Sequence, residues 1–289
     1  MSAASGFGPN PWQQTSWDWR AAGNFICGGA GTGLLVAVAL FGAGAAASLR
    51  SPDWLVFTGL ALIGLGLMCV WLEIGRPLRA LNVFINPRTS WMSREAWVSV
   101  ALFPVGLAAL LGLSGAIWLT AALALAFLYC QSRMLPAARG IPAWRSGWFS
   151  TLFVLTAGCE GCGIFMLCGL FSTRVSGLAL LAFLVLLAAR LLVWRRYRSA
   201  VDASLAARAR SALDLAGRNV LILGSVVPGL MLLGGWFLGG VAGPLLMAVA
   251  GVCAAAAGAR LKYILVTRAS FNQGFALTNM PVRGTRPGR

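Results

Sequence analysis

Residues 22–47 read AGNFICGGAGTGLLVAVALFGAGAAA, a stretch that contains no charged side chain. A helix needs roughly 20 apolar residues to cross the ~30 Å hydrocarbon core of a bilayer. Seven further apolar runs of comparable length follow, each bounded by charged residues, Pro or Gly. The sequence therefore predicts an all-α membrane protein, a bundle of eight transmembrane helices at residues 22–47, 54–73, 95–113, 115–135, 148–171, 174–194, 219–239 and 243–266.

The composition also favours a membrane location. Of the 289 residues, 59% are hydrophobic and 10% are charged, whereas a soluble domain is roughly 45–50% apolar. The formal charge of +16 does not indicate a nucleic-acid partner, because the Arg residues stand between apolar runs rather than on a basic face. The first twenty residues lack the basic start and apolar core of a signal peptide.

The distribution of positive charge predicts the orientation. If all eight runs cross the membrane, 21 of the 23 Lys and Arg residues fall on one side, and only Arg50 and Arg174 on the other. Since loops rich in Lys and Arg stay in the cytoplasm, we expect both termini there, in a bacterial cytoplasmic (inner) membrane. The expected organisation is a cytoplasmic segment at 1–21, the membrane domain at 22–266 and a cytoplasmic tail at 267–289. The opposite loops are short, so partner subunits are expected on the cytoplasmic face.

The residue types that usually hold redox cofactors are scarce. Histidine is absent, so bis-His ligation of haem is impossible and we expect no haem. The seven cysteines lie in or beside apolar runs and are interpreted as small buried hydrophobes. Cys159 and Cys162 form a C-x-x-C pair, but no second pair stands at ligand spacing, so we predict no metal site. Any redox centre must then belong to a partner or to a quinone.

Three of the seven acidic residues stand out, because an ionisable group at membrane depth is a functional candidate by default. Glu160 lies inside the fifth run among small residues. It is a candidate for proton exchange, although a structural hydrogen bond or ion pair between helices explains it equally well. Glu95 opens the third run, where the helix dipole and a Ser93 cap would also account for an acid. Glu73 closes the second run, where the dipole disfavours an anion and an Arg partner is expected.

The most distinctive motifs lie between the second and third runs. They read Gly75-Arg76-Pro77-Leu78-Arg79-Ala80-Leu81-Asn82 and Ser90-Trp91-Met92-Ser93-Arg94-Glu95. This pattern resembles the Gly-x-Pro-x-Arg-Ala-x-Asn and Ser-x-x-Ser-x-Glu elements of the NrfD/DmsC (polysulfide reductase and dimethyl sulfoxide reductase) family of membrane anchor subunits. The Gly-rich run after Asn24, the stretch from Arg133 to Trp144 and the segment from Gly258 to Tyr263 add to the resemblance.

The resemblance implies a haem-free anchor that holds a four-cluster iron–sulfur subunit and a molybdopterin catalytic subunit and offers a site to ubiquinone or menaquinone. In this family the glutamate that matches Glu95 is associated with the quinone site. The position of Glu73 is a histidine in the dimethyl sulfoxide reductase anchor, so Glu73 departs from that pattern. Reduction of a quinone takes two electrons and two protons, and we expect Glu95, Glu73 and Glu160 to exchange protons. The candidate quinone contacts are Asn24, Arg79, Trp91, Arg94 and Arg133, and the candidate docking residues are Arg76, Arg88, Ser90 and Arg139.

The predicted orientation narrows the choice of catalytic partner. A cytoplasmic docking face disfavours periplasmic dimethyl sulfoxide or polysulfide reduction. It favours similarity to membrane-bound sulfite dehydrogenase or to phenylacetyl-CoA:acceptor oxidoreductase, both of which send electrons to the quinone pool. A small-solute transporter is the alternative, but it should show an internal repeat, and the surroundings of Pro104 and Pro228 do not match. A stand-alone lipid enzyme would need a catalytic cluster, and the acids here are few and dispersed.

Overall fold

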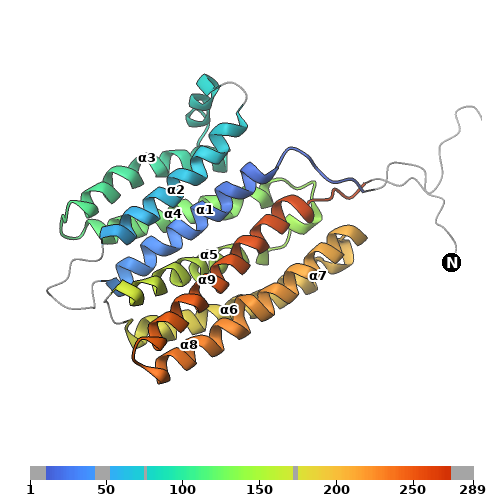
Figure 1. Ribbon diagram of the computed structural model, residues 1–289. Coiled ribbons are helices and arrows are strands. Elements are labelled where there is room, and N and C mark those ends of the chain that lie inside the picture. The colour runs from blue at the N-terminus through green and yellow to red at the C-terminus, as the bar shows by residue number, and fades with distance from the viewer. Residues whose placement is uncertain (1–10, 43–52, 75–76, 172–174, 275–289) are drawn as a thin grey trace, which may run out of the picture.

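The computed structural model of the protein describes residues 11–42, 53–74, 77–171 and 175–274 (Figure 1). Within these ranges the chain is helical and has no β-strand longer than a single bridge between Gln13 and Phe271, which confirms the predicted all-α class. The long helices are α1 (Trp19–Ala37), α2 (Asp53–Glu73), α3 (Trp91–Leu110), α4 (Ala116–Ala137), α5 (Trp148–Phe165), α6 (Gly177–Val201), α7 (Ala207–Leu221), α8 (Val227–Leu238) and α9 (Ala242–Tyr263). Shorter 3-10 and π-helical segments are η1 (Val38–Gly42), η2 (Pro77–Phe84), η3 (Pro142–Trp144), η4 (Met166–Phe171), η5 (Asp202–Ser204), η6 (Ile222–Val226) and η7 (Ile264–Arg268).

Seven helical stretches of the described chain are long and apolar enough to cross a membrane. α3 stands where the run at 95–113 predicted a helix, but it is not one of the seven. Arg94 and Glu95 near its start lower its mean hydropathy, which explains the difference. The count of eight spans therefore stays a prediction. The seven stretches are Trp19–Gly42, Trp54–Glu73, Ala116–Ala137, Trp148–Leu170, Gly177–Ser204, Ala207–Leu238 and Ala242–Arg268.

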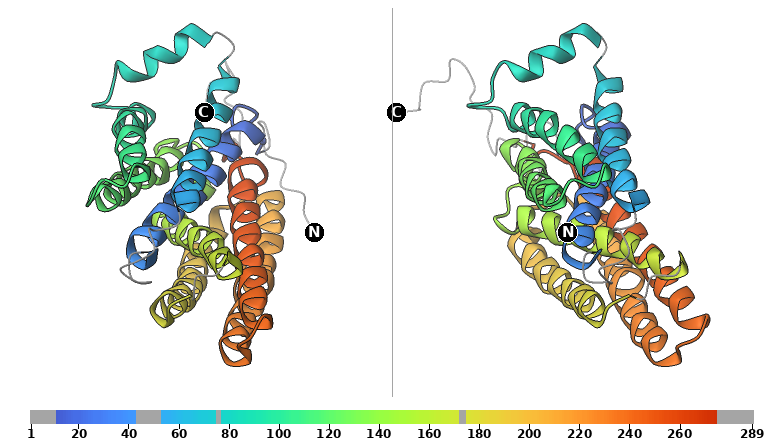
Figure 2. Two further views of the ribbon diagram at one scale, coloured as in Figure 1. Left: turned by 60° about the vertical axis from the view of Figure 1, so that its left-hand side comes forward. Right: turned by 90° about the vertical axis from the view of Figure 1, so that its left-hand side faces the viewer.

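Helix α1 lies at the centre of the bundle, with α2 and α4 on one side and α5 and α9 on the other (Figures 1 and 2). Its backbone comes very close to its neighbours. A Cβ atom added to Gly33 would lie 2.1 Å from the Ala157 carbonyl oxygen, and one on Gly31 would lie 2.5 Å from that of Gly59. Small residues thus let helices pack backbone to backbone where lipid provides no hydrophobic drive.

The connection between α6 and α8 is helical rather than an open loop. α6 continues to Val201, past the predicted end at 194, and α7 begins at Ala207 and runs through η6 into α8. The arginines expected in a loop therefore lie on helix ends. The turns between α3 and α4 and between α8 and α9 are tight, and Gly239 and Gly240 at the second take positive φ angles of 59° and 55°.

The segments that precede α1 and follow η7 lie side by side. The Gln14 backbone N–H donates to the Ser270 carbonyl at 3.0 Å, and the Asn272 N–H donates to the Trp12 carbonyl at 3.0 Å. Just before α1, Asp18 accepts from the Arg20 backbone and side chain, and the side-chain hydrogen bond holds the pKa of Asp18 below its ordinary value. Both segments are therefore at the same end of the bundle.

Candidate functional site

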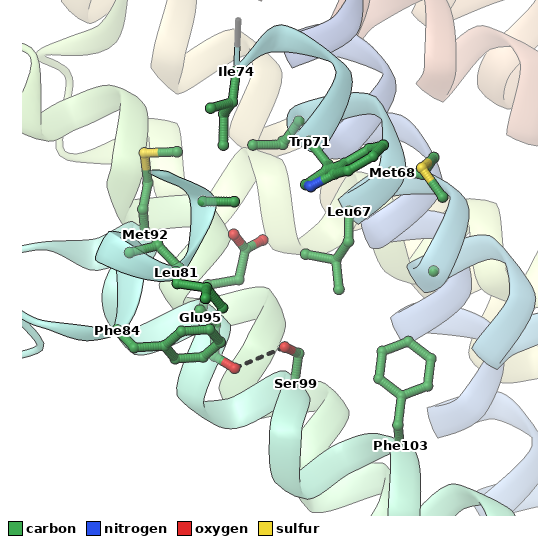
Figure 3. Close-up of a pocket in the computed structure, with 15 residues that line it drawn as sticks. Leu67, Met68, Trp71, Ile74, Leu81, Phe84, Met92, Glu95, Ser99 and Phe103 are labelled. Atoms are coloured by element: carbon green, nitrogen blue, oxygen red, sulfur yellow. Dashed lines mark hydrogen bonds between the residues drawn. The ribbon is translucent and has the colours of Figure 1, made fainter. Parts of the chain in front are cut away.

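A cavity of about 690 Å³ lies between α2, α3 and η2 (Figure 3). We call it the Glu95 cavity, because Glu95 is the one ionisable residue among the described residues that line it. Figure 3 shows its carboxyl pointing into a space surrounded by apolar side chains. Several of these are also exposed on the outside of the bundle, so the cavity opens laterally between α2 and α3. The main apolar lining residues are Leu67, Met68, Trp71, Phe84, Met92 and Phe103.

The segment η2 covers one end of the Glu95 cavity. It lies beyond the end of α2 in Figure 2 and contributes Leu81 and Phe84 to the lining. Two contacts hold it to α3: the Trp97 indole N–H donates to the Phe84 carbonyl at 3.1 Å, and the two rings pack edge to face with centroids 5.4 Å apart. The first motif singled out in the sequence therefore forms a cover for the cavity into which the second motif places its glutamate.

The local start of α3 positions Glu95. Ser90, not Ser93, is the N-cap, since its side chain accepts from the Ser93 backbone N–H at 3.3 Å. The helix consequently begins at Trp91, and Glu95 falls in its second turn, facing inward and only 4% exposed. A favourable interaction with the helix dipole at the first turn does not explain this carboxyl, because the dipole effect is confined to that turn.

Gln131 of α4 is the main partner of Glu95, and sequence reasoning missed it. Its Nε2 donates to Glu95 Oε1 at 3.2 Å and to the Asn24 carbonyl at 3.0 Å. The Asn24 side chain lies near the same carboxyl. All three side chains are buried, and Asn24 Oδ1 and Gln131 Oε1 have no donor among the described residues. A lone amide within the apolar run at 115–135 was the available signal.

A glycine makes room for this contact. A Cβ atom on Gly28 of α1 would lie 2.3 Å from Gln131 Nε2, well inside van der Waals contact. Gln131 thus reaches the backbone of α1 where a side chain is missing. Gly28 does more than bring two helices together, because it lets an amide lie between α1 and the Glu95 carboxyl.

A smaller pocket of about 240 Å³ adjoins the Glu95 cavity, and we call it the Glu73 pocket. It is lined by Asn24 and the partly buried Glu73, and it shares Val70, Ile74 and Met92 with the larger cavity. The two predicted glutamates and Asn24 therefore border two adjoining spaces. The Arg partner expected for Glu73 is not found in the described part of the chain: Arg20 lies nearby but pairs with Asp18 at 2.8 Å and donates to the Leu72 carbonyl.

The other predicted quinone contacts lie outside both pockets. The Arg94 guanidinium stacks on the Trp91 ring at 4.2 Å, and Arg133 lies 5.7 Å from the same ring. Arg94 also donates to the Pro87 and Arg88 carbonyls at 2.8 and 2.6 Å. These groups organise the loop before α3, while Arg79 on η2 is exposed. Their predicted contact with a quinone stays a prediction.

The predicted docking residues that the structure describes lie at the end of the molecule where α3 begins and α4 ends. Arg88 and Arg139 are exposed in the loops before α3 and after α4, and Ser90 caps α3. Arg76 lies outside the described residues. The second of these loops is tied to the C-terminal segment, because Arg145 donates to Gln273 at 3.0 Å and Trp144 donates to the Leu265 carbonyl at 2.9 Å. The loop face is therefore a connected surface.

Glu160 is on the opposite side of α1. Its Oε2 accepts from Lys262 Nζ of α9 at 2.6 Å, and each side chain is 1% exposed. Lys262 also donates to the Phe25 carbonyl at 3.0 Å and lies over the Phe153 ring. A Cβ atom on Gly29 would lie 2.0 Å from Nζ, so Gly29 makes room for Lys262 as Gly28 does for Gln131. Glu160 lines neither pocket, and its predicted part in proton exchange stays a prediction.

No cluster of three or more His, Cys, Asp or Glu residues that could hold a metal is found in the described ranges. Cys159 and Cys162 are buried free thiols in α5. The chemistry that this chain can offer from the described residues is thus that of a buried carboxyl, its amide partners and an apolar cavity.

Comparison with known proteins gives one family. The family described as the DMSO reductase anchor subunit (DmsC) matches residues 22–215, which include α2 to α6 and most of α1 and α7. No curated protein matches the chain. The matched range contains both loop motifs, Glu73, Glu95 and Gln131, but not Lys262. Because it covers about two-thirds of a chain whose helices are long and apolar enough to cross a membrane, this protein belongs to the DmsC family and is a multi-pass membrane anchor subunit of a molybdoenzyme complex.

Proposed function

We propose that this anchor binds a quinone, ubiquinone or menaquinone, in the Glu95 cavity and links it to the redox centres of its partner subunits. The observation that carries the proposal is one buried carboxyl aimed into an otherwise apolar cavity of about 690 Å³. This volume is within the ~300–1,000 Å³ of typical small-molecule sites, which combine apolar walls with a few polar groups. The lateral opening between α2 and α3 suits a ligand that arrives from the membrane.

A quinone takes up two electrons and two protons on reduction, and the electrons would come from an iron–sulfur subunit. Glu95 is placed to hold a proton beside the cavity and to transfer it to a ligand oxygen. Gln131 donates to Glu95 Oε1 and keeps the carboxyl in position, while Asn24, whose Oδ1 has no donor among the described residues, borders the adjoining pocket.

The Glu73 pocket offers the route for protons between Glu95 and water. Asn24 borders this pocket and lies near the Glu95 carboxyl, and Glu73 is partly exposed at the end of α2. A carboxylate at this position can pass protons between bulk water and the buried site. Glu73 would then serve where the dimethyl sulfoxide reductase anchor has a histidine.

The proposed partners are a four-cluster iron–sulfur subunit and a molybdopterin subunit on the cytoplasmic face, with oxidation of sulfite or phenylacetyl-CoA as the source of electrons. The split of 21 to 2 in Lys and Arg supports this orientation. The pairing of residues 12–14 with 270–272 supports an even number of crossings, and hence α3 as the eighth span. The exposed Arg88 and Arg139 then belong to the docking surface, with Arg76 as a further candidate.

Gentle purification of the protein from its native membrane tests the anchor and its partners together. We expect iron, molybdenum and two subunits without membrane spans to copurify with the chain, and the complex to reduce a quinone analogue with sulfite or phenylacetyl-CoA as donor. Isolation of the chain with neither metal nor partner subunits would contradict the proposed complex.

Replacing Gly28 with Ala is expected to weaken the quinone site without removing any polar group. The new Cβ would displace Gln131 from Glu95, and a hydrogen bond to a charged group contributes about 1.5–3 kcal/mol, so quinone-linked turnover should fall about 10- to 100-fold. Gly229→Ala is the matched control, since a Cβ there meets nothing within 4 Å. Gln131→Ala in the Gly28→Ala background should cause little further loss. Independent, additive losses would disprove the coupling.

A further inference from the structure

A second concave surface lies far along the chain from the Glu95 cavity, between α6 and α7. This groove of about 450 Å³ is lined by Leu191, Trp194 and Arg195 of α6 and by Leu213, Asp214 and Arg218 of α7. We call it the arginine groove; Arg198 and Leu221 also border it. Its lining is apolar on one part and cationic on the other, so it can accept a ligand that combines an anionic group with an apolar chain.

Two of its three guanidinium groups are uncompensated. Arg198 pairs with Asp202 at 2.8 Å and with Asp214 at 2.7 Å. Arg195 and Arg218 are exposed, and neither forms a hydrogen bond or an ion pair with the described residues. Since Asp214 is already engaged, the groove keeps a net positive charge that an anion can neutralise.

The lengths of the neighbouring apolar stretches argue that both free arginines lie at the same depth in the membrane. Arg195 directly follows the apolar stretch Gly177–Trp194, and Arg218 lies just before the apolar stretch Leu221–Leu238. Each stretch is about 27 Å long as a helix, which is close to the ~30 Å thickness of the hydrocarbon core. A stretch of this length across the hydrocarbon core would put the guanidinium groups at the level of the lipid phosphates. Leu191 and Leu221 border the groove on its hydrocarbon side, where they can contact an acyl chain.

Trp194 gives the groove a rigid wall. A Cβ atom on Gly217 would lie 3.0 Å from the Trp194 indole, so α7 approaches the ring closely only because this residue is glycine. The Arg198 guanidinium lies over the same ring, 5.9 Å from its centroid. Trp is a residue typical of the membrane interface. The groove is thus built by packing before any ligand arrives.

We propose that the arginine groove binds an anionic phospholipid, with Arg195 and Arg218 donating to phosphate oxygens and an acyl chain lying against Leu191 and Leu221. Basic pockets between transmembrane helices are suited to anionic lipid headgroups, and the bidentate fork of Arg matches phosphate geometry. A soluble anion would leave the apolar part uncovered, and a zwitterionic lipid would leave the positive charge uncompensated. This site is independent of the proposed quinone site.

Native mass spectrometry of the purified complex in detergent tests the proposal with phosphatidylglycerol, phosphatidylcholine of the same acyl chains, and glycerol phosphate. We expect phosphatidylglycerol to be retained about tenfold more than phosphatidylcholine and glycerol phosphate not to be retained. The double variant R195Q/R218Q should lose this preference. Its matched control is R196Q/R208Q, which removes two exposed charges from the same two helices outside the groove.

Each other outcome would overturn the site. Equal loss of phosphatidylglycerol from both double variants would show diffuse attraction to basic helix ends. Equal retention of both lipids would remove the role of charge, and retention of glycerol phosphate would show a soluble-anion site. Both variants alter exposed side chains, so their folding is checked by recovery of the intact complex before lipid is added.

Discussion

Glu95→Gln is expected to lower quinone-linked turnover by at least about 100-fold while the complex still assembles. The amide keeps the size of the side chain but cannot give up a proton, and a positioned acid or base typically contributes 10²–10⁴-fold. Glu95 is the one ionisable group among the described lining residues of its cavity, so no neighbour there can take over its part.

The measurement compares two activities of the same preparation. Turnover with a quinone analogue should collapse, whereas turnover with a water-soluble dye that accepts electrons directly from the partner subunits should be unchanged. Met92→Leu is the control for cavity shape, because it alters an apolar wall at nearly constant volume and should cost little. Full quinone-linked turnover in an assembled Glu95→Gln complex would exclude Glu95 from proton transfer.

Lys262→Met is expected to be the most destabilising single substitution that we propose. It leaves the Glu160 carboxyl without the partner that bonds it at 2.6 Å in the centre of the bundle. Removing one member of a buried ion pair typically costs about 3–5 kcal/mol, whereas replacing both by neutral groups costs much less. The double variant Lys262→Met/Glu160→Gln should therefore recover most of the loss.

Thermal unfolding of both variants in the same detergent measures this coupling. Equal destabilisation by the single and double substitutions would show that the pair contributes no interaction energy. Quinone-linked turnover of the double variant then tests the predicted role of Glu160. Since Glu160 lines neither pocket, we expect turnover to be retained; a selective loss would assign proton exchange to Glu160.

The place of the candidate site along the chain was predictable. The two loop motifs predicted that the segment between the second and third runs matters, and the structure forms η2 and the start of α3 from it, beside a cavity. Which of the polar residues there share a space was not predictable. The Trp91 ring packs against Arg94 and Arg133 outside the cavity, although all three residues were predicted to contact the same quinone as Glu95.

The reason lies in helix geometry. Successive residues of a helix point in different directions, so Arg94 and Glu95 have different surroundings although they are adjacent. Where α3 begins decides the direction of each, and that start depends on Ser90 rather than on Ser93. A cap three residues earlier than expected therefore places Glu95 in the second turn of α3 instead of the first.

The sequence by itself determined the membrane class, the helical runs, the absence of histidine and the family motifs, because hydropathy and motifs are local properties of a chain. Only the tertiary structure decided the partners of the buried polar groups. Asn24 and Gln131 are 107 residues apart and Glu160 and Lys262 are 102 apart, and these contacts exist because Gly28 and Gly29 leave space on two sides of α1. Packing against a central helix sets such contacts, and no pattern read along the chain contains that information.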